Sequence, residues 1–556
     1  MRRILLTFLG SLFICSIYAQ KQAIEISVDY SQESGNLNPS WAWFGYDEPN
    51  YTYMNDGQKL LSELSALSST PVYIRTHNLL TTGEGTYGRK WGSTNAYTED
   101  ENGNPIYNWK IVDSIVDVFV NNGMKPLMEI GFMPETLSSK PHPYRHSWAT
   151  EGELWTGWAY PPNDYKKWNA LVYEWVKHSV ERYGEEEVKT WFWEVWNEPN
   201  IGYWQGTFKE FCKLYDYTAE AVKRACPDCK FGGPHTTNPD SEEAKKYLVD
   251  FLKHCDIGTN YATGKKGSPL DFIAFHAKGN PKMVDDHIRM NMAPQLKAID
   301  NGFGVVRSFE KFKDLPVIIG ECDPEGCAAC SIQKHPQYGY RNGTMYPTYT
   351  VASHARIYDL AIKHQVNLKG ILTWGFEFEE QRWFDGFRDL ATNGIDKPIL
   401  NVFRMFSLMP NKRLHVENEN ALLVDEIIEN GIRGDKDDIH ALASKDENSM
   451  TILVWNYHDD DVLAETSNVE LVLKSIPTER VKKYHYRVDS NHSNSFEVWK
   501  KMGYPQEPSA EEFKELEKAG QLDLYEAPTT LKIENGQTKI NFSLPRQGVS
   551  LVKLVW

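Results

Sequence analysis

Two glutamates stand directly after apolar runs, and together they indicate the chemistry that the sequence suggests first. The run WFWEVW (191–196) leads into Asn197 and Glu198, and the run PVIIG (316–320) leads into Glu321. A carboxyl group with a dry wall on one side and substrate on the other can be held protonated or ionised. Cleavage of a glycosidic bond needs such a pair, because one group protonates the departing oxygen while the other handles the oxocarbenium-like carbon.

These glutamates fall in a region that alternates short, β-rich apolar runs with longer segments of helical period. In the segment 164–183, for example, apolar residues recur at steps of three and four. The pattern predicts a (β/α)8 barrel over residues 41–409. The strands are expected at 41–46, 72–77, 125–132, 191–196, 230–234, 271–276, 316–321 and 369–374.

Active sites of such barrels lie at the carboxyl ends of the strands, where Glu198 follows the fourth strand and Glu321 ends the seventh. A glutamate that merely faces solvent in a loop is the alternative for either residue alone. It explains both together poorly, because the two occupy equivalent places on strands of one barrel.

Other polar residues end neighbouring strands. Arg75 and His77 alternate onto the same face of the second strand, so both are expected to reach the floor of the site, with Arg75 holding Glu321 anionic. A core arginine satisfied by carbonyl groups is the competing interpretation of Arg75. His276 ends the sixth strand and is a candidate site residue. A packed, hydrogen-bonded histidine with a purely structural role is an equally good interpretation.

After Pro410 the pattern of apolar and polar residues changes to short alternating runs separated by polar turns. Runs such as 450–457, 469–476 and 549–556 predict an antiparallel β-sandwich domain over residues 410–556. The region 20–40 contains a strand-like stretch, AIEISVDY (23–30), that could complete this sandwich.

The first nineteen residues predict export. Arg2 and Arg3 precede an apolar run that ends at Ala19, the expected cleavage point of a secretory signal. A periplasmic or extracellular location follows from this prediction. Lipidation at Cys15 is the alternative, but the preceding residues LFI lack the small residue of a lipoprotein signal. No later run offers the ~20 apolar residues of a membrane span.

Composition narrows the partners. Aromatic residues make up 13% of the chain, with 18 Trp and 29 Tyr, and sugar rings stack on such side chains, although most of them are expected in the core. The net charge of -16 argues against a nucleic-acid partner and is compatible with an uncharged polysaccharide.

Seven cysteines remain after removal of the signal, so at least one thiol stays free if the others pair. The pairs Cys226/Cys229 and Cys327/Cys330 have the local spacing of a four-thiolate zinc site. Local disulfides or buried thiols are the favoured alternatives, because a separation of about a hundred residues leaves the pairing of the two halves unconstrained by the sequence.

A resemblance spans the whole predicted barrel. The stretches that carry it, in order, are EPNY (48–51), YIRTH (73–77), MEIGFMPE (128–135), FWEVWNEPN (192–200), GGP (232–234), DFIAFH (271–276), VIIGECD (317–323) and NGIDKP (393–398). On these stretches the chain resembles glycoside hydrolase family 39, which includes β-xylosidases and α-L-iduronidases.

The resemblance implies that Glu198 is the catalytic acid/base and Glu321 the nucleophile, with net retention of anomeric configuration and carboxyl groups roughly 5 Å apart. Glu321 is then expected to be ionised and Glu198 to start protonated. Asn197 would bind the sugar 2-hydroxyl, or else simply close a turn before Pro199. Glycosidases of this kind need no cofactor or metal.

The sequence departs from the family after the sixth strand, where a typical HxY becomes His276-Ala277-Lys278, so Lys278 is expected to face the substrate. After the eighth strand, Trp374 is expected to form the platform under the sugar ring and Glu377 to bind sugar hydroxyls. A Cys-rich loop, ECDPEGCAAC (321–330), replaces the simpler loop of the family after the nucleophile. A different loop beside Glu321 is expected to reshape the substrate pocket and leave the mechanism unchanged.

The leading expectation is an exo-acting enzyme that releases terminal β-xylosyl or α-L-arabinofuranosyl units from plant polysaccharide or its oligosaccharides. An α-L-iduronidase-like activity is the main alternative, but it needs cations for the uronate carboxylate, and Lys278 is the obvious spare one. A disaccharide-releasing glycosidase and a non-catalytic carbohydrate-binding barrel are the others.

Overall fold

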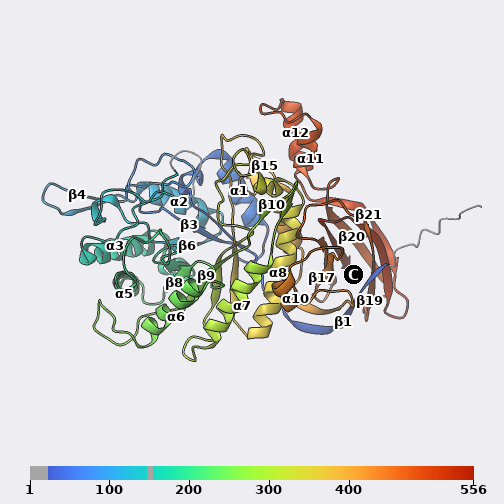
Figure 1. Cartoon of the computed structure of the whole chain (residues 1–556), viewed down its shortest axis with the longest axis horizontal. Helices are drawn as coiled ribbons and strands as arrows, with labels where there is room; N and C mark the ends of the chain where they lie inside the picture. Colours follow the sequence, from blue (N-terminus) through green and yellow to red (C-terminus); the bar gives the residue numbers. More distant parts are fainter. Residues whose placement is uncertain (1–22, 147–153) are drawn as a thin grey trace, which may run out of the picture.

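The computed structural model describes residues 23–146 and 154–556, which form a barrel and a β-sheet domain lying side by side (Figure 1). The predicted signal (1–19), with Cys15, lies outside the described residues. No helix within the described part of the chain is both long enough and apolar enough to cross a bilayer.

Eight parallel strands close the barrel in the order β12-β13-β2-β3-β6-β7-β8-β9. Each overlaps one of the predicted apolar runs, which confirms the (β/α)8 barrel. The strands are β2 (Trp43–Tyr46), β3 (Tyr73–Thr76), β6 (Lys125–Glu129), β7 (Phe192–Glu194), β8 (Lys230–Thr236), β9 (Phe272–Lys278), β12 (Val317–Asp323) and β13 (Leu368–Trp374).

A helix follows each barrel strand. These helices are α1 (Asn55–Ala66), α2 (Lys110–Asn121), α3 (Tyr165–Tyr183) with the short α4 (Glu185–Val188), α5 (Phe208–Ala225), α6 (Glu242–Ile257), α7 (Ala293–Arg307), α8 (Met345–His364) and α9 (Pro398–Ser407). In α3, Asp164 accepts hydrogen bonds from two main-chain N–H groups of the first turn, and the predicted apolar stripe is buried.

The second domain is a nine-stranded sheet in the order β21-β20-β23-β18-β17-β16-β1-β19-β22. Its strands are β1 (Ile24–Asn36), β16 (Lys412–Glu417), β17 (Asp438–Lys445), β18 (Ser449–Tyr457), β19 (Ser467–Lys474), β20 (Arg480–Val488), β21 (Asp523–Lys532), β22 (Thr538–Leu544) and β23 (Gly548–Val555). The sheet folds into a sandwich, because residues from both of its halves, such as Val454 and Leu471, share one hydrophobic core.

The strands of residues 410–556 pair antiparallel, as predicted, and β1 from the N-terminal region joins them with one parallel pairing. β1 pairs in parallel with β19, from Ile24 opposite Val469 to Asp29 opposite Lys474. β1 arrives from the far end of the chain, so no hairpin turn dictates its direction. In Figure 1 it runs as a blue strand among the orange and red strands of the sheet.

The sandwich packs directly on the barrel. Helix α8 lies against β18 and β23, and Leu453, Trp455 and Leu551 belong to the same hydrophobic cluster as the barrel helices. Burial of one such leucine contributes about 2 kcal/mol.

The remaining elements are short helices and hairpins. The helices are α10 (Val424–Asn430) and the projecting pair α11 (Ser495–Lys501) and α12 (Ala510–Ala519). The hairpins are β4 (Tyr97–Glu99)–β5 (Pro105–Tyr107), β10 (Lys282–Val284)–β11 (His287–Arg289) and β14 (Ala391–Thr392)–β15 (Ile395–Asp396), and the 3-10 helices are η1 (Pro49–Tyr51), η2 (Glu135–Leu137) and η3 (Pro336–Asn342).

The two CxxC pairs are local disulfides, Cys226–Cys229 and Cys327–Cys330, with Cα–Cα distances of 5.3 and 5.7 Å. Their four sulfurs are therefore not available as thiolate ligands, and the zinc alternative is wrong. Among the described residues Cys212, Cys255 and Cys322 are free thiols, and all three are buried.

Candidate active site

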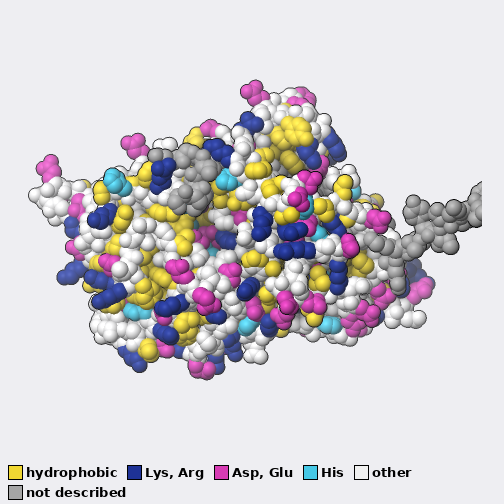
Figure 2. All heavy atoms as spheres, viewed as in Figure 1, with side chains coloured by type: hydrophobic (Ala, Val, Ile, Leu, Met, Phe, Trp, Pro, Cys, Tyr) yellow, Lys and Arg dark blue, Asp and Glu magenta, His cyan; other side chains and the backbone are white. Residues whose placement is uncertain are grey.

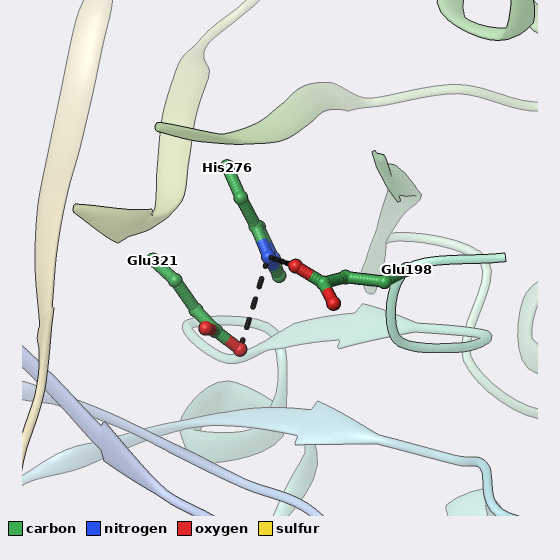
Figure 3. A group of neighbouring side chains, drawn as sticks. All are labelled: Glu198, His276 and Glu321. Atoms are coloured by element: carbon green, nitrogen blue, oxygen red, sulfur yellow. Dashed lines mark hydrogen bonds and ion pairs between the residues drawn. The ribbon is translucent and has the colours of Figure 1, made fainter. Parts of the chain in front are cut away.

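Two side chains from barrel strands and one from the loop after a third strand meet at the carboxyl end of the barrel (Figure 3). Glu198 follows β7, His276 lies in β9 and Glu321 lies in β12. One carboxylate oxygen of each glutamate and one ring nitrogen of His276 lie within 4.8 Å of one another. The Nδ1 atom of His276 is 2.9 Å from Oε1 of Glu198 and 3.8 Å from Oε1 of Glu321. The two glutamates are therefore close enough to act on one bond.

The backbone aims both glutamates into this space. Glu198 has a left-handed φ of 42°, and its main-chain N–H donates to the carbonyl of His235 at 3.0 Å. The pairing of β12 with β9 shifts register between Ile319 and Glu321, and such bulges redirect side chains. Residue 320 must be glycine, because a Cβ there would overlap the His235 ring.

Arg75 joins four acceptors on the barrel floor. Its Nε donates to Glu194 at 2.6 Å, its Nη1 to Glu321 at 3.1 Å, and its Nη2 to both Glu129 and Asn197 at 3.1 Å. These partners are side chains, three of them carboxylates, so the interpretation of Arg75 as a core arginine satisfied by carbonyl groups is wrong. The position beside Glu321 is the one that the sequence predicted.

His77 bridges the floor to a second ion pair at the rim. Its ring nitrogens lie 2.7 Å from Asp47 and 2.7 Å from Glu129. Burial lowers the pKa of His77, but the carboxylates of Glu129 and Asp47 outweigh it and raise this pKa to about 9. Asp47 also pairs with the buried Lys90. His77 is thus a cation held between the carboxyl groups of Asp47 and Glu129.

Lys278 contacts the predicted nucleophile itself. Its Nζ lies 2.8 Å from Oε2 of Glu321 and 2.6 Å from Oδ2 of Asp323. Burial alone raises the pKa of Glu321, but the charges of Lys278 and Arg75 hold it well below its usual range. Lys278 is therefore a paired cation that keeps Glu321 ionised.

A buried ion network continues behind Lys278. Arg388 lies between Asp323, with Nε to Oδ1 at 3.6 Å, and Glu325, with Nη1 to Oε1 at 2.9 Å. Glu325 also contacts Arg341 at 2.6 Å, and Arg341 donates to the carbonyls of Cys327 and Cys330. The network therefore connects the loop closed by the Cys327–Cys330 disulfide to β12, the strand that carries Glu321.

We expect Glu325→Gln to lower the melting temperature at neutral pH, because breaking a buried pair costs about 3 kcal/mol. Burial raises the pKa of Glu325, but Arg341 and Arg388 lower it from 4.5 to about 2. A depressed folded-state pKa stabilises the protein above pH 4.5. This stabilisation disappears as the pH falls towards 2.

Thermal melts of both proteins across this pH range test the linkage. The difference in melting temperature should narrow as the pH falls below 4.5. Glu470→Gln, which removes a partly buried partner of the exposed Lys539 on the sandwich, is the control and should change little. A difference that stays constant down to the lowest pH would contradict the assignment.

Two sequence-predicted residues have unexpected surroundings. Trp374 is only 2% exposed, lies 4.9 Å from the Arg75 guanidinium and 4.3 Å from the His77 ring, and donates from Nε1 to Asp47 at 3.2 Å. It is at the site, with little of its ring open to a ligand. Glu377 is 1% exposed, and its Oε1 accepts from the Gly394 main chain at 2.6 Å.

The expectation that Glu377 binds sugar hydroxyls stays a prediction, since one of its carboxylate oxygens bonds the main chain and the other has no protein partner among the described residues. Burial and the nearby carboxylate of Asp56 raise the pKa of Glu377 well above its usual range, and its contacts lie in the loop after β13. Strand periodicity does not reveal the contact with the Gly394 main chain, because it depends on the course of the loop that follows Trp374.

Sequence reasoning missed several residues that the structure brings into the site. These are Asp47, Lys90, Glu129, Glu194, His235 and Asp323. Glu129 and Glu194 had a signal, since each is a charged residue inside an otherwise apolar strand, where an unpaired charge is costly.

The trio of Glu198, His276 and Glu321 also offers ligand types that a divalent cation accepts. Arg75 and Lys278 already place two positive charges against Glu321, so a metal ion there would meet like charges. The arrangement suits one protonated and one ionised carboxyl group better than a metal centre.

Comparisons with known proteins show which family and which fold the chain resembles. The family model described as glycosyl hydrolases family 39 matches residues 24–537. A β-xylosidase of Caldicellulosiruptor saccharolyticus is 26% identical over 90% of this chain and 93% of its own length. The mouse α-L-iduronidase is 24% identical over 74% of this chain and 63% of its own length. The crystal structure of a monomeric β-xylosidase from Caulobacter crescentus CB15 shares the fold, with a TM-score of 0.74, 21% identity, and coverage of 96% of this chain and 99% of that one.

Proposed function

The chain belongs to glycosyl hydrolase family 39 and is a glycoside hydrolase, and from this premise we propose that it is an exported, retaining enzyme. Its proposed substrates carry terminal β-xylosyl or α-L-arabinofuranosyl units on plant polysaccharide or its oligosaccharides. The observation that carries the proposal is the approach of Glu198 and Glu321, whose carboxylate oxygens come within 4.8 Å. Retaining enzymes place their carboxyl groups roughly 5–5.5 Å apart, whereas inverting enzymes need about 6.5 Å or more.

In the proposed mechanism Glu321 attacks the anomeric carbon while Glu198 protonates the departing oxygen. Glu198 then removes a proton from water, which releases the sugar from Glu321 with its configuration retained. Arg75 and Lys278 support the anionic form of Glu321 at 3.1 and 2.8 Å. Because Arg75 holds the side-chain oxygen of Asn197, the amide nitrogen of Asn197 remains to bind the sugar 2-hydroxyl.

The pairing of the cations favours an uncharged terminal sugar over a uronate. Lys90, Lys278 and Arg388 each contact carboxylates of the protein. A substrate carboxylate would have to displace one of these partners, which is costly in a buried site. The visible molecular face likewise mixes Lys and Arg with Asp and Glu (Figure 2), a surface compatible with a neutral partner.

Export is supported by the N-terminal pattern and by the two disulfides, since disulfides persist mainly in oxidising compartments. Mass spectrometry of the secreted or periplasmic protein tests this part of the proposal. A mature N-terminus at Gln20 would support it, and a lipidated N-terminal Cys15 would favour the anchored alternative.

The substrate test is a panel of aryl glycosides: β-D-xyloside, α-L-arabinofuranoside, α-L-iduronide and β-D-galactoside. We expect turnover of a pentoside.

In Lys278→Met the acid limb of the pH profile of activity should move to higher pH by about one unit, because Glu321 loses a cation that keeps it ionised. Lys282→Met, an exposed substitution in β10, is the control.

A different pattern would support the uronate alternative. Preferential turnover of the iduronide, lost selectively in Lys278→Met while turnover of other glycosides persists, would mean that Lys278 binds a substrate carboxylate. If none of the aryl glycosides is hydrolysed, the next substrates to test are disaccharide-terminated glycosides and natural polysaccharides.

A further inference from the structure

A second histidine extends the contacts of Glu198 into the barrel core. The Nε2 atom of His276 lies 3.3 Å from Nδ1 of His235, and Nε2 of His235 contacts Oε2 of Glu194. Glu194 in turn accepts from Nε of Arg75 at 2.6 Å. Both histidines and Glu194 are fully buried. The four residues Glu198, His276, His235 and Glu194, called here the histidine chain, run from the open site to a dry core.

The buried end of the histidine chain has one direction of hydrogen bonding. Burial raises the pKa of Glu194, but Arg75 outweighs it and lowers this pKa to about 2, so Glu194 is an ionised acceptor. Burial lowers the pKa of His235, the carboxylate of Glu194 opposes this, and with the charge of Arg75 the net result is a pKa of about 3. Its ring is therefore neutral, with one donor and one acceptor nitrogen. Its proton must therefore be on Nε2, facing Glu194, which leaves Nδ1 as an acceptor.

The assignment of donor and acceptor on His235 also fixes which nitrogen of His276 donates. Because Nδ1 of His235 accepts, Nε2 of His276 must donate to it. A neutral His276 then presents a lone pair from Nδ1 to Oε1 of Glu198, at 2.9 Å. A hydrogen bond between them requires one extra proton, either on Glu198 or on the His276 ring.

We propose that His235 is a positioning residue that keeps this proton on the Glu198–His276 pair until the leaving group takes it. The inference rests on the proposed role of Glu198 as the acid/base. In the first half-reaction the proton passes from the pair to the departing oxygen. In the second half-reaction the attacking water returns a proton to Glu198, because the lone pair of His276 disfavours an unprotonated neighbour. No other reactant is consumed.

The backbone supports this reading. His235 has a left-handed φ of 56°, Glu198 one of 42°, and the carbonyl of His235 accepts from the Glu198 N–H at 3.0 Å. A register shift between Pro234 and Thr236 interrupts the pairing of β8 with β9 at this residue. Non-glycine residues keep such conformations where the surrounding structure enforces them, often at active sites. One residue thus holds both the main chain and, through His276, the side chain of Glu198.

Other titratable groups face the histidine chain. Glu321 Oε1 is 3.8 Å from Nδ1 of His276, and its charge is shared with Arg75 and Lys278. Burial raises the pKa of Tyr144 and Tyr203, whose neighbours include Glu198, so both hydroxyls stay neutral. The group opposite Glu198 that can hold or accept the proton is therefore His276.

The first test compares His235→Ala with His235→Gln on an aryl glycoside whose leaving group needs protonation. In the alanine variant a neutral His276 can turn its proton to Nδ1 and bond an ionised Glu198. The alkaline limb of kcat/KM should therefore move to lower pH by about one unit, a roughly tenfold loss above it. Gln can donate to Glu194 and accept from His276, so His235→Gln should retain most of the original profile.

Two controls separate positioning from damage to the fold. With a strongly activated leaving group, glycosylation by His235→Ala should be nearly unchanged, because that step needs no proton. His485→Gln removes another buried histidine, which lies between Glu526 and Ser550 in the sandwich, and should leave the profile unaltered. A profile of His235→Ala that superimposes on that of the unaltered enzyme would overturn the proposal.

The second test needs no turnover and no alanine variant. In ¹⁵N-histidine NMR spectra of the full protein, with resonances assigned by their loss in His235→Gln and His276→Gln, the His235 ring should carry its proton on Nε2 alone. The His276 ring should be protonated at Nε2, with or without Nδ1. A neutral His276 protonated only at Nδ1 would refute the histidine chain. Absence of any glycoside hydrolysis would refute the proposed function but leave this test decisive.

Discussion

Glu321→Ala should lower kcat by about 10⁴-fold or more on every substrate that the enzyme hydrolyses. The substitution removes the proposed nucleophile, so no glycosyl-enzyme can form on the protein. The fold should survive, because Arg75 keeps Glu194 and Glu129 as partners and Lys278 keeps Asp323. Steady-state assays with aryl glycosides, together with a melting curve, measure both effects.

Azide makes this prediction specific. In Glu321→Ala the small anion can occupy the cavity and attack the anomeric carbon directly, which gives a glycosyl azide of inverted configuration. Glu470→Ala, which changes a partly buried glutamate of the sandwich far from the site, is the control and should keep full activity. Retention of more than about one part in a hundred of kcat in Glu321→Ala would place the nucleophile elsewhere.

Glu198→Ala should produce the second-largest loss, and its size should depend on the leaving group. General acid–base catalysis contributes about 10² to 10⁴-fold, so natural oligosaccharides should lose most and strongly activated aryl glycosides least in the first step. With activated substrates the glycosyl-enzyme should accumulate, because no base deprotonates water. Burst kinetics and mass spectrometry of the trapped intermediate measure this.

Azide should restore turnover of activated substrates by Glu198→Ala, because azide attacks the glycosyl-enzyme without a general base, and the product should have retained configuration. The two variants thus differ in the stereochemistry of the azide that each forms. If the Glu198 variant gives the inverted azide and the Glu321 variant the retained one, the two roles are reversed.

The sequence alone was sufficient for the barrel and for the two glutamates. Strand runs and helical stripes are local patterns, so eight strands could be located within a few residues, and the ends of β7 and β12 pointed to Glu198 and Glu321. The same rule placed Arg75 beside Glu321, although 246 residues separate them, because the carboxyl ends of barrel strands converge.

Only the tertiary structure decided what each polar group contacts. Lys278 was expected to face the substrate, yet it pairs with Glu321 and Asp323, because β9 and β12 are neighbours and the register shift at residue 320 turns Glu321 towards it. Glu377 follows β13 by only three residues but lies against the main chain at Gly394. Side-chain partners depend on strand register and loop direction, which periodicity does not encode.

The histidine chain shows the same division. The sequence identified His276 at the end of a strand, but His235 follows the motif GGP (232–234) as an unremarkable residue. A left-handed φ and a bulge in β8 turn its ring towards His276, and the absence of a side chain at Gly320 leaves room for it. Residue types and periodicity therefore determined the barrel and its two glutamates, whereas barrel closure, bulges and local backbone angles decided which groups share a proton.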